Sequence, residues 1–214
     1  CPGSRRKNGR GGALSPSSAV DLQLYYKQGN YQLVEAETLV SHDAICSDWE
    51  RLAYGAIVAE AVEVLWPEEE AQIEVYEFLF RFFALLESRS PRIAAGAGLW
   101  KVLELAGFGA EFEACIHCGD ELHEGRLSTD EGGFYGPCCT TGELGTKASK
   151  ETLAALRILQ EYPWDGSDLQ GSIRGKELVA AEKILLEYLT YHLEKPLKSL
   201  EFLQKMEKAG RNPF

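Results

Sequence analysis

The chain has 214 residues, of which 45% are hydrophobic and 26% charged, and its formal net charge is −11. This apolar fraction supports one large domain or two small ones, which excludes a largely disordered chain. No stretch reaches the roughly 18 consecutive apolar residues that a membrane helix needs. Arg81 interrupts the most apolar run, from Phe78 to Leu86. The acidic balance also excludes a surface that binds nucleic acid everywhere.

A short basic segment begins the chain. The first twenty residues contain Arg5, Arg6, Lys7 and Arg10 and no acidic residue. Such an arm on an acidic chain is typical of a segment that contacts a polyanion, and a solvated tail has the same composition. The opening CPGSRRKNGRGG lacks Met, which predicts that N-terminal residues are missing.

The next segment predicts a β-hairpin. Residues 20–26 alternate between apolar and polar side chains, residues 27–30 read KQGN, and residues 31–40 form a second strand pattern. A two-stranded hairpin on its own has only marginal stability in water. We therefore expect further strands that are absent before Cys1.

The pattern becomes helical from Ser47 onward. Ser47 and Glu50 match a capping box, with Ser47 as N-cap. Apolar residues follow at helical spacing: Leu52, Ala56, Ala59, Val62 and Leu65. Pro67 is expected to end this helix and to occupy the first position of the next. Glu68, Glu69 and Glu70 then fall in its first turn, where negative charge interacts favourably with the helix dipole. That second helix is expected to be lined by Tyr76, Leu79, Phe80, Phe83 and Leu86.

Further helices are predicted over residues 91–106, 149–162, 176–192 and 199–208. Gly107 is a candidate for the left-handed residue that terminates the first of these. Residues 164–174 are expected to form a loop. Between the helices, residues 112–145 contain a cysteine cluster and many glycines, which predicts short strands and tight turns.

The strongest chemical signal is this cysteine cluster. Cys115 and Cys118 have the C-x2-C spacing of a zinc knuckle, and Cys138 and Cys139 follow about twenty residues later. The second pair is adjacent, so both thiols reach one metal only through a tight turn, for which Gly136-Pro137 precedes them. His117 or His123 could replace one thiol, and a metal-free knuckle held by packing is the alternative. A zinc ion held by four cysteines is structural, because no coordination position stays open.

Sequence templates for catalysis are absent. The chain contains no P-loop, no H-E-x-x-H and no G-x-S-x-G. His192 falls late in an amphipathic helix, where packing or the helix dipole explains it better than catalysis does. We therefore expect a protein that is not an enzyme.

Four features in this order resemble the bacterial RecO family of recombination mediators. They are the basic arm 3–16 leading into a strand, the turn and strand 29–40, the mid-chain cysteine module, and the ending YLTYHLEKPLKS at 188–199. The chain departs from the family in two places. The first strands are missing before Cys1, and adjacent Cys138 and Cys139 stand where a C-x2-C is usual.

The resemblance implies an α+β fold: a partial OB-type β-barrel over residues 1–44, then a mostly helical domain over 45–214, with a zinc-knuckle module inserted at about 112–145. It implies binding of single- and double-stranded DNA, annealing of complementary strands and, with RecR, loading of RecA onto DNA covered by single-stranded-DNA-binding protein. The implied location is the bacterial cytoplasm, at the nucleoid and not at a membrane. A zinc-stabilised scaffold that binds only proteins is the alternative.

An OB groove combines cations with aromatic platforms for bases. The candidate DNA-binding residues are Arg5, Arg6, Lys7, Arg10 and Lys27, with Tyr25, Tyr26 and Tyr31 as platforms or as ordinary sheet packing. The candidate ligands of a structural Zn²⁺ are Cys115, Cys118, Cys138 and Cys139. The resemblance also implies that the helical domain docks the acidic, apolar tail of single-stranded-DNA-binding protein. That tail needs a hydrophobic cleft beside a cation, for which Arg157, Lys195 and Lys198 are candidates.

Overall fold

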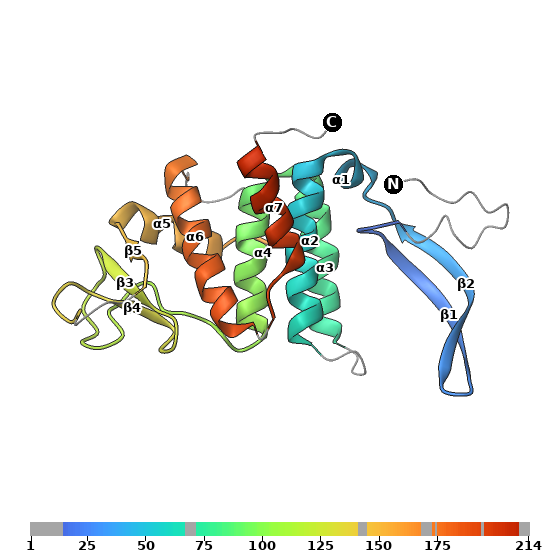
Figure 1. Cartoon of the computed structure of the whole chain (residues 1–214), viewed down its shortest axis with the longest axis horizontal. Helices are drawn as coiled ribbons and strands as arrows, with labels where there is room; N and C mark the ends of the chain where they lie inside the picture. The colour runs from blue at the N-terminus through green and yellow to red at the C-terminus, as the bar shows by residue number, and fades with distance from the viewer. Residues whose placement is uncertain are drawn as a thin grey trace.

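A computed structural model describes residues 15–66, 72–140, 145–167, 173, 175–193 and 195–209. The elements are β1 (Ala19–Lys27), β2 (Asn30–Val40), α1 (Asp43–Ser47), α2 (Trp49–Leu65), α3 (Ile73–Ser88), α4 (Pro91–Leu105), β3 (Gly125–Ser128), β4 (Gly133–Tyr135), β5 (Lys147–Ala148), α5 (Lys150–Gln160), α6 (Gly175–His192) and α7 (Lys198–Ala209). Figure 1 shows the β1–β2 hairpin at one end, the β3–β5 sheet at the other and the helices between them. The mixed α+β class is confirmed, and the described residues form two separate sheets without a closed barrel.

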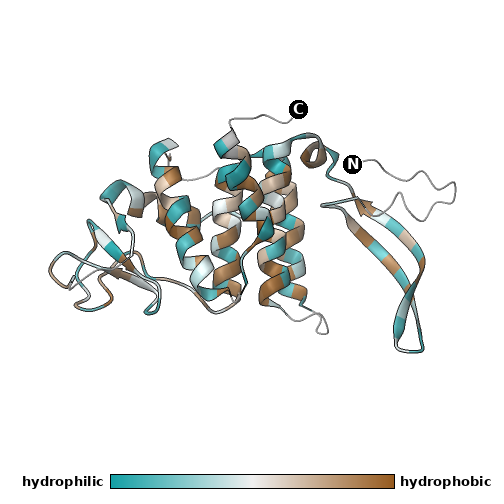
Figure 2. Cartoon of the chain, viewed as in Figure 1, coloured by the Kyte–Doolittle hydropathy of each residue, from teal (hydrophilic) through white to brown (hydrophobic). Residues whose placement is uncertain are grey.

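The β1–β2 hairpin matches the sequence prediction. Its strands are antiparallel and pair Lys27 with Asn30 across a two-residue turn. Both turn residues have positive φ, 53° at Gln28 and 81° at Gly29. That geometry is the primed turn whose twist suits a hairpin, and glycine adopts it without strain. Hydrophobic and hydrophilic residues alternate along both strands (Figure 2), and most of their side chains are exposed.

The first long helix begins one residue later than its capping signal predicts. Asp48 is the N-cap of α2, and its Oδ1 accepts hydrogen bonds from the backbone N–H groups of Glu50 at 2.9 Å and Arg51 at 3.3 Å. Ser47 instead ends the short helix α1 and donates its hydroxyl to the Asp43 carbonyl at 3.0 Å. The predicted Ser47 cap is therefore wrong, because α1 already uses this serine and aspartate caps equally well.

The helix after it also starts later than expected. Helix α3 begins at Ile73 with Gln72 as its N-cap, so the assignment of Pro67 to its first position is wrong. Helix α2 has Trp66 as its C-cap, in agreement with an end just before Pro67. Residues 67–71, including Glu68 to Glu70, lie outside the described residues.

The buried faces of α2 and α3 agree only in part with the predicted ones. In α2, Val62 and Leu65 pack against the core as expected, but Leu52 and Ala56 are exposed; the helix buries Ala53, Tyr54, Gly55, Ile57, Val58 and Ala61. In α3, Leu86 is buried as expected and Leu79 and Phe83 pack against the core, but Tyr76 is 54% and Phe80 is 41% exposed. The other buried residues of α3 are Val75, Phe78, Phe82 and Leu85. Both helices carry apolar residues on more than one face, so periodicity alone does not select the side that meets the core.

Helix α4 lies at the centre of the helical layer and contacts α2, α3, α5 and α6. Small residues allow these close approaches: a Cβ added at Gly98 would lie 2.9 Å from the Phe82 ring. The helix ends at the predicted glycine. Gly107 has φ +83°, and the N–H groups of Gly107 and Phe108 donate to the carbonyls of Glu104 and Leu103, the two bonds of a Schellman motif.

Polar side chains tie the helices together at two points. The Tyr54 hydroxyl on α2 donates to Glu182 on α6 at 2.8 Å, and Arg92 on α4 donates to the Tyr54 hydroxyl at 2.7 Å. Glu60 on α2 caps the start of α7, as it accepts from the N–H groups of Lys198 and Ser199. These contacts fix three central helices and attach the last one. Across the described ranges, no helix combines the length and apolar character needed to cross a bilayer.

Candidate functional site

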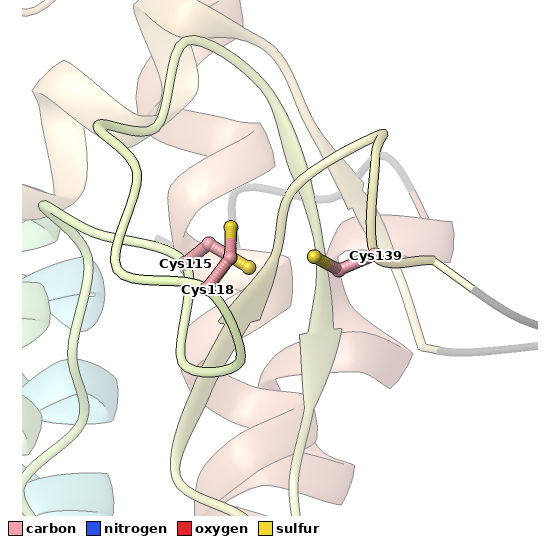
Figure 3. Close-up of side chains that lie close together, drawn as sticks. All are labelled: Cys115, Cys118 and Cys139. Carbon is pink, nitrogen blue, oxygen red and sulfur yellow. The ribbon is translucent and has the colours of Figure 1, made fainter.

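The fold brings all four module cysteines into one cluster. Cys115 and Cys118 precede β3, and Cys138 and Cys139 follow β4. The Sγ atoms of Cys118 and Cys138 are 3.8 Å apart, and those of Cys138 and Cys139 are 3.5 Å apart. The Sγ atoms of Cys115, Cys118 and Cys139 also lie within 4.8 Å of one another. Figure 3 shows the Cys139 sulfur directed across the gap between the two loops toward the first pair.

These separations suit a tetrahedral thiolate site. Zinc binds cysteine sulfur at about 2.3 Å, so the sulfurs of a regular tetrahedron are about 3.8 Å apart. The 3.8 Å between Cys118 and Cys138 equals that edge, and the 3.5 Å between Cys138 and Cys139 is slightly shorter. The cluster could therefore hold a metal ion.

Two tight turns produce this arrangement. Gly119, with φ +78°, follows the first pair and donates its N–H to the Cys115 carbonyl at 2.8 Å. In the second loop, the N–H groups of Cys139 and Thr140 both donate to the Gly136 carbonyl at 3.0 Å. Cys138 and Cys139 therefore lie in a turn, where neighbouring side chains diverge less than in extended backbone. The adjacent pair thus reaches one cluster by the tight turn that its sequence requires.

The surroundings of Cys115 favour a thiolate. Burial raises the pKa of this thiol, but hydrogen bonds from the backbone N–H groups of Cys118, Gly136 and His117 lower it to about 6. Gly136 donates to the sulfur at 3.3 Å. By contrast, hydrogen bonding to Cys118 and Cys138 raises the pKa of Cys139, because neighbouring sulfurs share protons when they are crowded together. A metal ion would release those protons on binding.

The histidines of the module do not join the cluster. The metal-competent groups among the described residues are Cys115 with Cys118 and Cys139, and Cys118 with Asp120 and Cys138. The His117 ring lies near Tyr135 instead, with 6.2 Å between ring centroids. Neither group contains His117 or His123: Cys115, Cys118 and Cys139 form one of them, and Cys138 meets Cys118 in the other, beside Asp120.

The module is anchored to the helices by two side chains that sequence reasoning did not assign to this task. Arg157 on α5 donates to the carbonyls of Phe112 at 2.8 Å and Leu122 at 3.4 Å. Glu187 on α6 accepts from the Thr146 N–H at 3.3 Å and from its hydroxyl. Arg157 is thereby engaged on the module and is not a free cation for a peptide tail. Its one sequence signal is a basic residue in the leucine-rich pattern of α5.

The candidate DNA-binding residues divide into two groups. Arg5, Arg6, Lys7 and Arg10 lie outside the described residues. Lys27 ends β1 at the hairpin tip and is exposed. Tyr25, Tyr26 and Tyr31 surround it with 59%, 60% and 72% of their surface exposed. The rings of Tyr26 and Tyr31 pair across the strands with centroids 5.0 Å apart. The cross-strand pair of Tyr26 and Tyr31 agrees with ordinary sheet packing, and the exposed surface of all three tyrosines agrees with a role as platforms.

A large cleft lies where the ends of α2, α4 and α6 meet the start of α7. Its volume is about 1480 Å³, and its lining includes Leu65, Trp66, Leu105, Phe108, Lys195 and Lys198. Two of the three cations proposed from the sequence thus border this cleft, whose lining is both polar and apolar. Glu63 and Glu201 also line it, and Glu60 faces it while capping α7.

Comparisons with known proteins agree on one family. Residues 46–201 match the family model described as "Recombination protein O C terminal". The chain is 33% identical to the DNA repair protein RecO of Pelotomaculum thermopropionicum over 97% of this chain and 80% of that relative. It is 30% identical to the RecO proteins of Nocardioides sp. and Symbiobacterium thermophilum, over 95% and 97% of this chain and 85% of each relative. These matches confirm the resemblance seen in the sequence and the expectation of a protein that is not an enzyme. The chain therefore belongs to the RecO family, a family of DNA repair proteins and not of catalysts.

Proposed function

We propose that this protein binds single- and double-stranded DNA, anneals complementary strands and, with RecR, helps to load RecA onto strands covered by single-stranded-DNA-binding protein in the bacterial cytoplasm, at the nucleoid. The observation that carries the proposal is the match to DNA repair proteins RecO over at least 95% of the chain, hairpin included. Such a protein acts by holding strands and partners together, so it needs no catalytic group.

The DNA contact in this proposal combines the basic arm with the hairpin tip. Arg5, Arg6, Lys7 and Arg10 neutralise phosphates, and Lys27 extends that positive charge onto β1. Exposed Tyr26 and Tyr31 offer ring faces on which bases stack without sequence preference. The hairpin forms part of an OB-type domain over residues 1–44, and the exposed apolar face of its strands supports further strands in that domain.

Zinc has a structural role in this proposal. Cys115, Cys118, Cys138 and Cys139 hold the ion, and the sulfur separations of 3.5 and 3.8 Å support that ligand set. A closed site of four thiolates leaves no position for a reacting water. Its contribution is to join the loops on either side of the β3–β4 hairpin, inside a helical domain over residues 45–214.

The helical domain docks the tail of single-stranded-DNA-binding protein in the cleft beside α7. The apolar wall with Leu65, Trp66 and Phe108 suits apolar side chains, and Lys195 and Lys198 suit carboxylates. Because Glu63 and Glu201 also line this cleft, a change of either to Gln should strengthen the binding of an acidic peptide. Lys195→Ala with Lys198→Ala should weaken it.

The DNA contact is tested by anisotropy and strand annealing with labelled oligonucleotides at several salt concentrations. The variant Arg5→Ala/Arg6→Ala/Lys7→Ala should bind less tightly, and its salt dependence should be shallower by about 2 logarithmic units per tenfold salt for single strands. The matched control is Lys176→Ala/Lys205→Ala/Lys208→Ala, which removes the same charge from exposed positions of α6 and α7. If both variants bound DNA with equal affinity, the basic arm would not be the DNA contact.

Two further measurements separate the proposal from its alternative. Metal content by mass spectrometry should give about one zinc per chain, with loss in Cys118→Ser. Binding of the tail peptide without any DNA binding by the same protein would replace annealing with a zinc-stabilised protein scaffold.

A further inference from the structure

The cysteine cluster has an uneven exposure to solvent. Cys115 is 3% exposed, whereas Cys118 and Cys138 are exposed and Cys139 is half-buried. We infer that the cluster is also a redox-sensitive modification site, at which a hydroperoxide converts Cys118 and Cys138 into a disulfide. The inference rests on the cysteine geometry and not on DNA binding, although its effect falls on the proposed zinc site.

The distance between the sulfurs and their exposure to solvent favour this pair. The Sγ atoms of Cys118 and Cys138 are already in contact at 3.8 Å, and both side chains are open to a small oxidant. The sulfurs must approach to about 2.05 Å, which rotations about χ1 in exposed loops can supply.

The nearest alternative pair is disfavoured by its own backbone. Cys138 and Cys139 have sulfurs 3.5 Å apart. Their Cα atoms are joined by a trans peptide, because the described chain has no cis bonds, and this fixes them about 3.8 Å apart. Unstrained disulfides need about 4.4 to 6.8 Å between Cα atoms. The adjacent pair therefore stores strain if it is oxidised, and Cys118 is the better partner for Cys138.

The chemistry balances with one peroxide molecule. One thiolate of the pair attacks a peroxide oxygen, the O–O bond breaks, and a sulfenic acid forms while the departing hydroxide takes a proton to become water. The second thiolate then attacks the sulfenic sulfur, the S–O bond breaks, and a second hydroxide leaves with a proton. Two thiols and one hydrogen peroxide give one disulfide and two waters, and the sulfurs together lose two electrons.

Oxidation removes half of the thiolate donors. A disulfide sulfur no longer acts as an anionic ligand, so only Cys115 and Cys139 would remain for a metal ion. The new bond still links the same two loops, from the outer side of the cluster. Oxidation thus replaces a cross-link through a metal ion with a disulfide cross-link between the same loops. A cellular dithiol can reduce this disulfide and restore the two thiols.

Peptide mapping tests the pairing directly. The starting protein is the full chain with Cys1→Ser and Cys46→Ser, which removes the thiols outside the cluster. After treatment with one equivalent of hydrogen peroxide per chain, free thiols are blocked with iodoacetamide and the protein is digested with trypsin. Cleavage after Lys101, Arg126 and Lys147 gives peptides 102–126 and 127–147, which carry Cys115 with Cys118 and Cys138 with Cys139 respectively.

The expected product is a cross-link between peptides 102–126 and 127–147, with fragmentation that locates it at Cys118 and Cys138 and a loss of two free thiols. Cys118→Ser should abolish it, and Cys139→Ser should retain it as the matched control. A disulfide within peptide 127–147, a link through Cys115, or thiols that stay free would each overturn the inference. The readout needs neither zinc nor DNA, so it can fail or succeed independently of the proposed function.

Discussion

Loss of the Glu60 cap should loosen α7 and with it one wall of the cleft. The Glu60 carboxylate accepts from the Ser199 hydroxyl at 2.5 Å, the Ser199 N–H at 2.8 Å and the Lys198 N–H at 3.0 Å. It thereby satisfies two of the unpaired N–H groups at the start of α7, although it belongs to another helix. Few side chains in the described chain reach so far along the sequence to cap a helix.

The loss of stability on substitution of Glu60 can be worked out from the contacts that disappear. Loss of a capping side chain costs about 0.5 to 2 kcal/mol, and the favourable charge at a helix N-terminus adds about 0.3 to 1 kcal/mol. Glu60→Ala should therefore lower the free energy of unfolding by about 1.5 kcal/mol, and Glu60→Gln by about 1 kcal/mol, because the amide keeps an acceptor but loses the charge. The corresponding fall in Tm is about 3 to 6 °C for Glu60→Ala and about 2 to 4 °C for Glu60→Gln.

The dependence on pH gives a second measure of the same contact. Partial burial raises the pKa of Glu60, and hydrogen bonds from Ser199 and Lys198 lower it by more, so that it lies below the usual pKa of a glutamate. Folding therefore gains from the ionised group above the unfolded pKa, and the gain disappears as the pH falls through the lower, folded-state pKa. The stability difference between the wild type and Glu60→Gln should be full at neutral pH and shrink in acid.

Urea denaturation and hydrogen exchange at the α7 amides check these values. Glu63→Ala is the control, because Glu63 is exposed on the same helix and lines the same cleft. It should leave α7 exchange unchanged. Equal stability of Glu60→Ala and Glu63→Ala, or a Glu60→Gln difference that persists undiminished in acid, would refute the capping argument.

Three further changes test packing and anchoring. Gly98→Ala should gain about 1 kcal/mol of helix propensity but lose about 1 to 3 kcal/mol because the added Cβ forces the Phe82 ring aside. Urea titration should show a net loss of stability, and a smaller loss when Gly98→Ala is made in a Phe82→Leu background. A net gain of stability would refute the close contact. Gly107→Ala should cost about 1 kcal/mol through its positive φ alone, because no atom lies within 4 Å of the added Cβ, and calorimetry measures it. Arg157→Ala should speed hydrogen exchange in the cysteine module while the exchange of α2 stays unchanged; equal exchange in the module would contradict the anchoring role.

The hairpin and the ends of several helices follow from short local signals. The turn at Gln28-Gly29 and the stop at Gly107 both depend on positive φ, which the sequence marks with glycine. Local signals are weaker where two neighbours compete. Ser47 and Asp48 are equally good caps, and only the presence of α1 decides between them.

The inward faces of the helices depend on the assembled fold. Phe80 and Phe82 are equally apolar in the sequence, yet Phe82 is fully buried and Phe80 is 41% exposed. The difference arises because α4 offers Gly98 as a space for one ring. In the sequence, Gly98 indicates only a residue of low helix propensity. Its role in packing becomes visible when the structure places the Phe82 ring against it.

The cysteine cluster could be predicted, and so could the tight turn that brings Cys138 and Cys139 to it. The spacing indicates one C-x2-C knuckle and an adjacent pair, and Gly136-Pro137 marks the turn, which the structure builds around the Gly136 carbonyl. The roles of Arg157 and Glu187 could not be predicted, because their partners are backbone groups and a threonine far away in the sequence. Contacts of this kind produce no pattern of residue types in the sequence from which they could be predicted.

The position of the cysteine module within the chain bears on the order of folding. Helices α4 and α5 pack together, with Leu159 against Gly96, yet the entire module separates them in sequence. An unfolded segment of that length makes their encounter entropically costly, and a folded module shortens the effective loop. During synthesis, α1 to α4 emerge first and leave apolar groups such as Trp100 uncovered until the module closes. The closing of the module over Trp100, whose ring packs against Phe112, thus shortens the time for which apolar surface of the nascent chain is exposed.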